Sequence, residues 1–404
     1  MRLGDVIEIK HGYAFNGEHI IEEDNSVVLV TPGNFRIGGG FQEKKCKFFD
    51  GEIPQDYVLK AGDFIVTMTD LSKNIDTLGY SAWVPKSEKR IYLHNQRIGL
   101  VSLKNNKCDR GYIYWLMRTH AYQRTIANTS TGSTVHHTSP SKIYEYECDV
   151  PDISIQHRIA TILSRYDSLI ENYQKQIKLL EEAAQRLYKE WFVDLHFPGH
   201  ENAKIVNGVP EGWEKKSVKT IVELQSGYAF KSSDFASDGI YKIVTIKNVK
   251  DGAFDGENVS KIASIPEKMP KHCILEDGDI LLSLTGNVGR VCIVVGKNYL
   301  LNQRVAKLKS IFKAYTYCLF RSRDMFIDVN NLANGAAQQN VSPIKIGEMK
   351  ILIPENKLLN EFEKESSNYI SGVIAFQSQI RLLTEARDRL LPKMMSGEIE
   401  FNFK

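Results

Sequence analysis

The sequence lacks paired cysteines and long hydrophobic runs. Its six cysteines stand apart with no Cys-x-x-Cys pair, so we expect neither a zinc site nor a disulfide framework and interpret the thiols as buried and free. No run of about 18 uncharged apolar residues occurs, and the opening Met1–Asp5 matches neither a secretory signal nor a transit helix. We therefore expect a folded, cytoplasmic protein.

Motifs that supply chemistry are also missing. The 12 prolines include no Pro-Pro pair, which excludes the Asn/Asp-Pro-Pro-aromatic motif of amino-methyltransferases, and no Phe-x-Gly-x-Gly loop for S-adenosylmethionine occurs. There is no P-loop, no His-Glu-x-x-His and no Gly-x-Ser-x-Gly. The adjacent His136 and His137 could bind a metal, but no third ligand lies nearby in the sequence. We predict no catalytic residue, no metal site and no cofactor held by this chain.

What is present is the composition of a folded protein with two or three domains. Hydrophobic residues make up 42% and charged residues 25% of the 404 positions. The formal net charge is +3, and residues 197–354 alone carry +5. A basic stretch of this size is compatible with a polyanion such as nucleic acid, although charge alone does not decide the partner.

The chain contains an internal repeat. Gly12-Tyr-Ala-Phe15 recurs as Gly227-Tyr-Ala-Phe230, and Asn95-Gln-Arg97 recurs as Asn302-Gln-Arg304. A constant offset of 203 residues then pairs later positions of the two copies, which include Tyr114/Tyr317, Arg118/Arg321, Gly132/Gly335, Ser139/Ser342 and Val150/Ile353. So many ordered matches over roughly 190 residues indicate a duplicated unit.

Each copy begins with a globular part. Short β-branched and aromatic runs separated by glycine, such as Ser26–Thr31 and Arg290–Val295, predict strands. Short helical patterns follow at residues 112–128 and 314–330, so we expect an α+β globule with a curved sheet. We interpret the Gly-Asp pairs before Phe64 and Ile280 as tight turns that lead into strands.

Each copy ends in a long helix with an apolar stripe. The first stripe is Ile155, Ile159, Ile162, Tyr166, Leu169, Tyr173, Ile177, Leu180, Ala184, Leu187 and Trp191. The second is Leu359, Phe362, Ser366, Tyr369, Val373, Phe376, Ile380, Leu383, Arg387, Leu390 and Met394. Intervals of three and four over about five heptads predict a coiled coil, with Ser366 and Arg387 as polar interruptions that fix the register. The alternative is an amphipathic helix that lies on its own globule.

These patterns divide the chain into four parts: residues 1–151, a helix at 152–196, a second globule at 197–354, and a second helix with a tail at 355–404. Since the second helix must start near the end of the first, we expect the two helices to run antiparallel in a pseudo-twofold molecule. About 38 residues at roughly 1.5 Å each give a rod of some 57 Å, long enough to act as a ruler between two related readers.

The two copies differ most in polar loops. Between the matched Gly132 and Ser139 the first copy reads Ser-Thr-Val-His-His-Thr, where the second reads Ala-Ala-Gln-Gln-Asn-Val. Side chains of this kind bind base edges. We predict DNA contacts at polar loop and turn positions, namely Lys73, Asn74, Arg97, Ser133, Thr134, His136, His137, Lys231, Asn287, Arg290, Arg304, Gln338, Gln339 and Asn340. Ordinary drift of loops after a duplication is the alternative explanation.

With this architecture the sequence resembles the specificity subunits of type I restriction-modification systems. The resemblance is carried by Val209-Pro-Glu-Gly-Trp213, the two Gly-Tyr-Ala-Phe turns, Leu301-Asn-Gln-Arg304, the segments 150–163 and 167–172, and the two Gln-x-Gln-Ile-x-Leu-Leu helices. The first copy departs from the pattern because it starts at Arg2 without a Pro-x-Gly-Trp entry, and the second has Asn360-Glu-Phe where the first has Gln156-His-Arg.

The resemblance implies a non-catalytic subunit with two tandem target recognition domains, each of which reads one half of a bipartite, asymmetric site in double-stranded DNA. It implies that the helical rod sets the unread spacer and docks two modification subunits, which carry S-adenosylmethionine and methylate adenine. Restriction subunits would join the same complex. Apolar residues near the rod ends, Trp191, Phe192 and Met394, are then expected partner contacts. Two alternatives remain: a free-standing enzyme, disfavoured by the missing motifs, and a duplicated scaffold that binds only protein.

Overall fold

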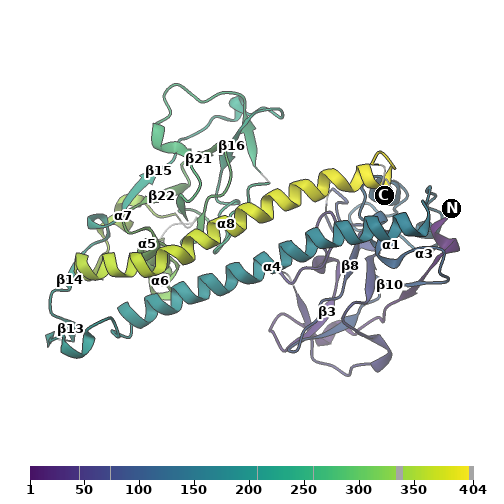
Figure 1. Ribbon diagram of the computed structural model, residues 1–404, viewed down its shortest axis with the longest axis horizontal. Helices are drawn as coiled ribbons and strands as arrows, with labels where there is room; N and C mark the ends of the chain where they lie inside the picture. The colour runs from purple at the N-terminus through teal and green to yellow at the C-terminus, as the bar shows by residue number, and fades with distance from the viewer. Residues whose placement is uncertain (45, 73, 207, 258, 334–339, 400–404) are drawn as a thin grey trace. The chain divides into compact units, whose positions relative to one another are not determined.

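The computed structural model describes residues 1–44, 46–72, 74–206, 208–257, 259–333 and 340–399. The chain divides into two compact units: unit 1 is Met1–Ser168 with Leu383–Lys404, and unit 2 is Leu169–Leu382. Each unit therefore contains one globule together with a part of each long helix (Figure 1).

The described part of unit 1 contains two larger sheets, the two-stranded pair β7–β11 and three short α-helices. Its strands are β1 (Ile7–His11), β2 (Ile20–Ile21), β3 (Val27–Val30), β4 (Lys47–Phe49), β5 (Val58–Leu59), β6 (Phe64–Thr67), β7 (Thr69–Asp70), β8 (Ser81–Trp83), β9 (Ile91–His94), β10 (Ile98–Leu103) and β11 (His136–His137). Its short helices are α1 (Arg110–Leu116), α2 (His120–Asn128) and α3 (Pro140–Tyr144). One sheet is antiparallel with order β1-β10-β6-β8, and the other has order β2-β4-β3-β9-β5 with β3 parallel to β9.

Unit 2 repeats this plan. Its strands are β12 (Ile205–Val206), β13 (Val209–Pro210), β14 (Glu214–Ser217), β15 (Glu223–Ser226), β16 (Tyr241–Val244), β17 (Ser260–Ile262), β18 (Ile274–Leu275), β19 (Ile280–Ser283), β20 (Val291–Ile293), β21 (Tyr299–Leu301), β22 (Val305–Lys309) and β23 (Lys350–Ile353). Its short helices are α5 (Lys313–Arg321), α6 (Arg323–Ala333) and α7 (Pro343–Glu348). The order β15-β22-β19-β20 matches β1-β10-β6-β8, and β16 lies parallel to β21 as β3 does to β9. The predicted α+β repeat is therefore confirmed.

Each predicted short helical segment consists of two helices. In unit 1 the break falls at Arg118, where the Thr119 side chain accepts the Tyr122 N–H and starts α2. In unit 2 it falls after Arg321, where the Ser322 hydroxyl accepts the Met325 N–H. A hydroxyl that accepts the backbone N–H three residues later caps the start of a new helix. This explains why one continuous sequence pattern gives two helices.

The long helices are α4 (Ile153–Phe192) and α8 (Asn356–Met395), each 40 residues long (Figure 1). In unit 2 they run antiparallel, because Tyr173 stacks on Phe376 at 5.0 Å between ring centroids while Trp191 meets Phe362 at 5.6 Å. Of the helices in the described ranges, none has the length and apolar character to cross a membrane.

The seam of α4 differs from the predicted stripe at two positions. Leu169 is 44% exposed, whereas Ile170 is 5% exposed, and Leu163 is fully buried where Ile162 was expected. With Leu163 and Ile170 in the seam, the intervals alternate strictly between three and four from Ile159 to Trp191. The doubled interval of four therefore moves from residues 169–177 to residues 155–163 at the start of the helix, and the rest of α4 follows the heptad repeat of a coiled coil.

The two polar seam residues of α8 are both satisfied. Ser366 is fully buried, and its hydroxyl donates to the Phe362 carbonyl one turn earlier at 2.6 Å. Arg387 pairs with Asp167 of α4 in unit 1, and the same carboxylate binds the buried Arg118 at 2.6 Å. Burial alone would raise the pKa of Asp167, but the two guanidinium groups hold it below its usual value. This ion cluster fastens the helix break at Arg118 to both long helices.

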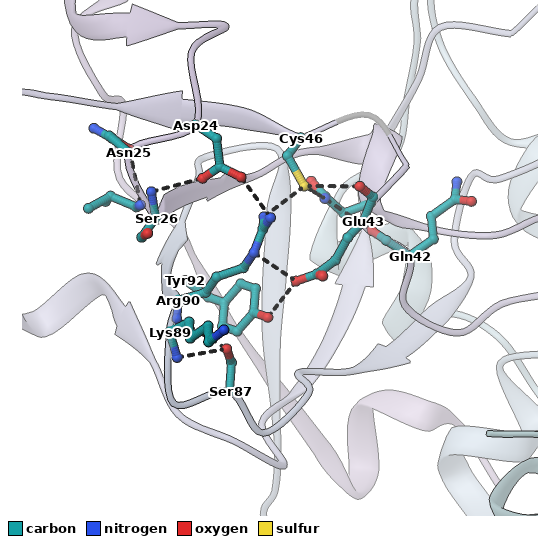
Figure 2. A network of polar contacts seen from close by, with 12 residues as sticks. Asp24, Asn25, Ser26, Gln42, Glu43, Cys46, Ser87, Lys89, Arg90 and Tyr92 are labelled. Carbon is teal, nitrogen blue, oxygen red and sulfur yellow. Dashed lines mark hydrogen bonds and ion pairs between the residues drawn. The ribbon is translucent and has the colours of Figure 1, made fainter. Parts of the chain in front are cut away.

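A second polar network links loops next to the five-stranded sheet of unit 1 (Figure 2). Arg90 pairs with Asp24 at 2.8 Å and approaches Glu43 at 3.8 Å, and the Tyr92 hydroxyl donates to Glu43 at 2.6 Å. The Cys46 thiol lies 3.7 Å from the Arg90 guanidinium, and burial raises the pKa of this thiol. These contacts tie three loops together around one arginine.

Candidate nucleic-acid interface

In unit 1 a single buried residue joins the segments that the sequence singled out. Met68 follows strand β6, and its N–H donates to the Arg97 carbonyl at 2.9 Å. The Met68 carbonyl accepts the N–H of Thr138 at 3.0 Å. The Asn95–Arg97 turn, the loop at 70–78 and the loop at 131–138 therefore meet at one edge of the domain. We call this arrangement the three-segment junction.

Unit 2 has the same junction around Leu284. The Leu284 N–H donates to the Arg304 carbonyl at 3.0 Å, and its carbonyl accepts the Val341 N–H at 2.9 Å. Both central residues are 3% exposed. Because only backbone atoms make these bonds, Met68 and Leu284 can differ in side chain while the geometry stays the same.

One residue further on, a short bridge joins the two loops in each unit. In unit 1, β7 pairs with β11, and the Thr69 hydroxyl lies 3.1 Å from the His137 imidazole. In unit 2, Thr285 bridges to Asn340, and the two side chains are hydrogen-bonded at 2.9 Å. His137 and Asn340 therefore occupy equivalent places with different hydrogen-bonding chemistry.

The Asn-Gln-Arg turn has the same construction in both units. The Asn95 side chain accepts the Arg97 N–H at 3.0 Å, and Asn302 accepts the Arg304 N–H at 3.2 Å. A Cβ at Gly12 would lie 2.2 Å from the Asn95 carbonyl oxygen, and one at Gly227 equally close to that of Asn302. The glycine of each Gly-Tyr-Ala-Phe motif is required by this close approach.

The loop of unit 1 is held by one buried carboxylate. Asp70 is 1% exposed and accepts the N–H groups of Ser72, Thr77 and Leu78 together with the Thr77 hydroxyl, at 2.6 to 3.0 Å. Burial alone would raise the pKa of Asp70, but the hydrogen bonds outweigh it and hold the pKa below the usual value. The neighbouring Asn74 is exposed on this loop.

The corresponding loop of unit 2 is built differently. The Ser283 hydroxyl donates to the Asn287 carbonyl and accepts the Arg290 N–H at 3.0 Å. Gly286 and Gly289 have φ of 71° and 85°, which a residue with a side chain rarely adopts. The two units thus share the junction and differ in the loop mounted on it.

Asp70→Asn is expected to destabilise unit 1 by about 1.5–3 kcal/mol at pH 7, because four donors lose an ionised acceptor. Since the folded pKa is lowered, the stabilisation is present above the unfolded pKa near 3.8 and is lost as pH falls through the folded value. Denaturant unfolding of both proteins at pH 7 and near pH 3 measures this. A difference that stays constant between the two pH values would contradict it.

A profile of the type I restriction modification DNA specificity domain matches the chain twice, at residues 1–182 and 210–368, once for each repeat. The chain belongs to this family. The MjaIX specificity subunit of Methanocaldococcus jannaschii is 28% identical over 299 residues, which cover 71% of this chain and 68% of that protein. The EcoBI specificity subunit of Escherichia coli is 23% identical over 312 residues, 72% of this chain and 61% of that protein.

A solved structure of similar fold is known for another protein. The crystal structure of the type I restriction-modification S subunit from M. genitalium covers 100% of this chain and 96% of its own, with a TM-score of 0.60 at 15% identity.

Most of the residues that we predicted to contact DNA lie around the two three-segment junctions. In unit 1 these are Asn74, Arg97, Ser133, Thr134, His136 and His137, and in unit 2 Asn287, Arg290, Arg304 and Asn340. Lys231 is exposed three residues after Tyr228, whose carbonyl accepts the Gln303 N–H. Lys73, Gln338 and Gln339 lie outside the described residues.

Beside the unit 2 junction lies a hollow of about 800 Å³. Its lining includes Phe235, Thr245, Lys247, Gln303 and Arg304. The backbone at Thr245, one of the lining residues, is held by a contact that the sequence analysis missed: the buried Asn248 side chain accepts the Thr245 N–H at 2.8 Å, as Asn34 does for Thr31 in unit 1. The Thr-x-x-Asn spacing after a β-branched run, repeated 214 residues apart, was the signal that could have found it.

The expectation that the rod ends expose apolar contacts is wrong for two of the three residues. Trp191 is 7% and Met394 5% exposed, and Phe192 is half-buried against Phe362 and Tyr315. The reason is that the helix ends pack into the cores of the globules, Trp191 in unit 2 and Met394 in unit 1.

All six cysteines are free; Cys108, Cys273, Cys292 and Cys318 are buried, whereas Cys46 and Cys148 are only half-buried. Burial raises the pKa of the Cys148 thiol to about 11, so it stays protonated at neutral pH. In the described part of the chain, no group of three or more His, Cys, Asp or Glu side chains could hold a metal ion.

Proposed function

We propose that this chain is the sequence-reading subunit of a type I restriction-modification complex, in which each repeat reads one half of a bipartite site in double-stranded DNA. The observation that carries the proposal is the three-segment junction. It recurs in both units with the same backbone bonds, yet it presents different polar side chains. One framework with two sets of polar loops suits two different half-sites.

The proposed base contacts follow from side-chain chemistry. Asn74, Ser133, Thr134, His136 and His137 serve the first half-site, and they offer amide, hydroxyl and imidazole groups. Asn287, Arg290 and Asn340 serve the second, with Lys231 beside them. An arginine pairs bidentately with guanine and an asparagine with adenine, each worth about 1–3 kcal/mol of discrimination.

The chemistry of the complex is assigned to other subunits. The curated relatives are named as specificity subunits of type I restriction enzymes. We assign S-adenosylmethionine and adenine methylation to two modification subunits, and translocation and cleavage to restriction subunits. This chain would determine which DNA sequence the complex recognises. Its paired helices α4 and α8 would set the length of the unread spacer between the two half-sites.

A pair of exposed leucines marks the docking surface for the modification subunits. Leu179 on α4 is 63% exposed and Leu382 on α8 is 48% exposed, and the two occupy the same place in the repeated Gln-x-Gln-Ile-x-Leu-Leu sequence. Two equivalent apolar positions on two antiparallel helices suit two copies of one partner. We place the modification subunits here rather than on Trp191 or Met394.

Leu179→Lys and Leu382→Lys are each expected to weaken the binding of one modification subunit by about ten- to hundredfold, because burial of a leucine contributes about 1.5–3 kcal/mol. The double variant should lose both. Native mass spectrometry of the assembled complex counts the bound subunits. The matched control is Lys175→Gln, an exposed change on the same helix, which should leave the stoichiometry at two.

The test of the proposed function is methylation mapping. The chain is co-expressed with its modification subunit, the host DNA is sequenced for modified adenine, and the experiment is repeated without the chain. A split motif that disappears without the chain is the expected result. Methylation that persists unchanged, or that never appears with an active partner, would favour the duplicated protein-binding scaffold instead.

A further inference from the structure

Each repeat keeps two exposed side chains that the fold itself does not require. In the Asn-Gln-Arg turn, Asn95 is buried and bonded to the Arg97 N–H, and the turn presses against Gly12. Gln96 and Arg97, however, are exposed, as are Gln303 and Arg304 in unit 2. Packing explains why the asparagine recurs, but it does not explain the exposed Gln-Arg pair.

The Gln-Arg pair lies at the edge of the loops that differ between the units. The Arg97 carbonyl is bonded to Met68, and the next residue, Thr69, is bridged to His137. In unit 2 the Arg304 carbonyl is bonded to Leu284, and Thr285 is bridged to Asn340. A duplex that contacts the loops would therefore pass beside the pair.

We propose that Gln96–Arg97 and Gln303–Arg304 bind the DNA sugar-phosphate backbone at the two half-sites, independently of sequence, while the loops bind the bases. This inference rests on the proposed function. If the two units bind different base sequences, the only part of DNA that is the same at both half-sites is the sugar-phosphate backbone. A residue pair that is the same in both units is therefore assigned to that backbone.

The chemistry of the pair suits a phosphate. A guanidinium donates two parallel N–H bonds to phosphate oxygens, and a glutamine amide adds a neutral donor. In unit 2, Arg304 and Gln303 line the hollow together with Lys247, which adds a second cation; Glu257 is an acidic residue of the same lining. Such contacts position the duplex so that the loops meet the groove in a fixed register.

The experiment uses the full-length chain assembled with its modification subunits. Arg97→Ala, Arg304→Ala and the double variant are measured for binding to a duplex with the mapped site and to an unrelated duplex, each over a series of salt concentrations. The controls are Lys60→Ala and Lys297→Ala, exposed cations in turns at the opposite end of the sheet from Met68 and Leu284.

Each arginine variant is expected to weaken binding to both duplexes by about tenfold or more and to reduce the slope of log affinity against log salt by about one unit. The double variant should reduce the slope by about two units. The preference for the mapped site should stay unchanged, and Arg97→Lys should keep the slope. His137→Ala should instead reduce the preference and keep the slope.

Three outcomes would overturn this inference. A changed base at one half-site would make the arginine a base contact. Unchanged DNA binding with weaker assembly of the complex would assign the pair to the modification subunit, and equal losses in the lysine controls would indicate a general charge effect. A wild-type complex that prefers no duplex over another would reject the proposed function itself, which is a separate result.

Discussion

Replacement of residues 1–151 by the corresponding domain of another family member is expected to change one half of the methylated site completely and to leave the other half unchanged. The three-segment junction of unit 1 is built from residues 68–138, and that of unit 2 from residues 284–341. Because no residue is shared between them, the two half-sites should be exchanged independently. Sequencing of modified adenine in host DNA measures both halves at once.

The exchange should succeed only if the new domain fits the helices that it packs on. Arg118 binds Asp167 of α4, and Leu391 and Met394 of α8 belong to the core of unit 1. A chimaera that keeps an arginine at position 118 is the suitable design, since Asp167 would otherwise lose one of its two guanidinium partners and keep only Arg387. A reciprocal exchange of residues 197–354 should alter only the other half-site, and a change in both halves after either exchange would contradict two independent readers.

The repeat and the architecture of each globule could be predicted because their signals are periodic. Gly12 and Gly227 mark the same turn, and strands β6 and β19 follow the same Gly-Asp pair, whose carboxylates Asp63 and Asp279 accept the N–H three residues earlier. Local chemistry of this kind acts over a few residues. It is therefore visible in the sequence and recurs in the structure.

The exposure of the helix ends could not be predicted, because it depends on distant packing. Trp191 looks like a surface residue at the end of a stripe, yet Phe362, Tyr188 and Phe192 surround it in the core of unit 2. Met394 is similarly covered by the globule of unit 1. An apolar stripe shows which face of a helix is buried, but not whether the partner is another helix, a globule or another protein.

The three-segment junction also could not be predicted from the sequence, because backbone atoms form it. Met68 and Leu284 have no polar side chain that would mark them, and their bonds reach residues 29 and 70 positions away in unit 1. Each loop and the Asn-Gln-Arg turn could be recognised in the sequence, but only as separate segments. Only the sheet order, which places β6 beside β10, brings them to one edge.

Lengthening both helices by one heptad is expected to lengthen the unread spacer while both half-site sequences stay the same. Duplication of residues 173–179 in α4 and of 370–376 in α8 keeps the seam in phase, because Tyr173 stacks on Phe376 and Leu180 contacts Gly372. Seven residues add about 10.5 Å, which corresponds to about three base pairs. Methylation mapping reads the new spacer directly.

The same insertion should lower the rate of methylation, and this effect separates a ruler from a flexible tether. Three base pairs turn the second half-site by about 100°, whereas a heptad turns a straight helix by only about 20°, so the DNA must twist to meet the second reader. A duplication in α4 alone would misalign the seam and should abolish assembly. If the matched duplication left the spacer and the rate unchanged, the helices would not set the distance between the half-sites, and the two readers would be linked by the partner subunits instead.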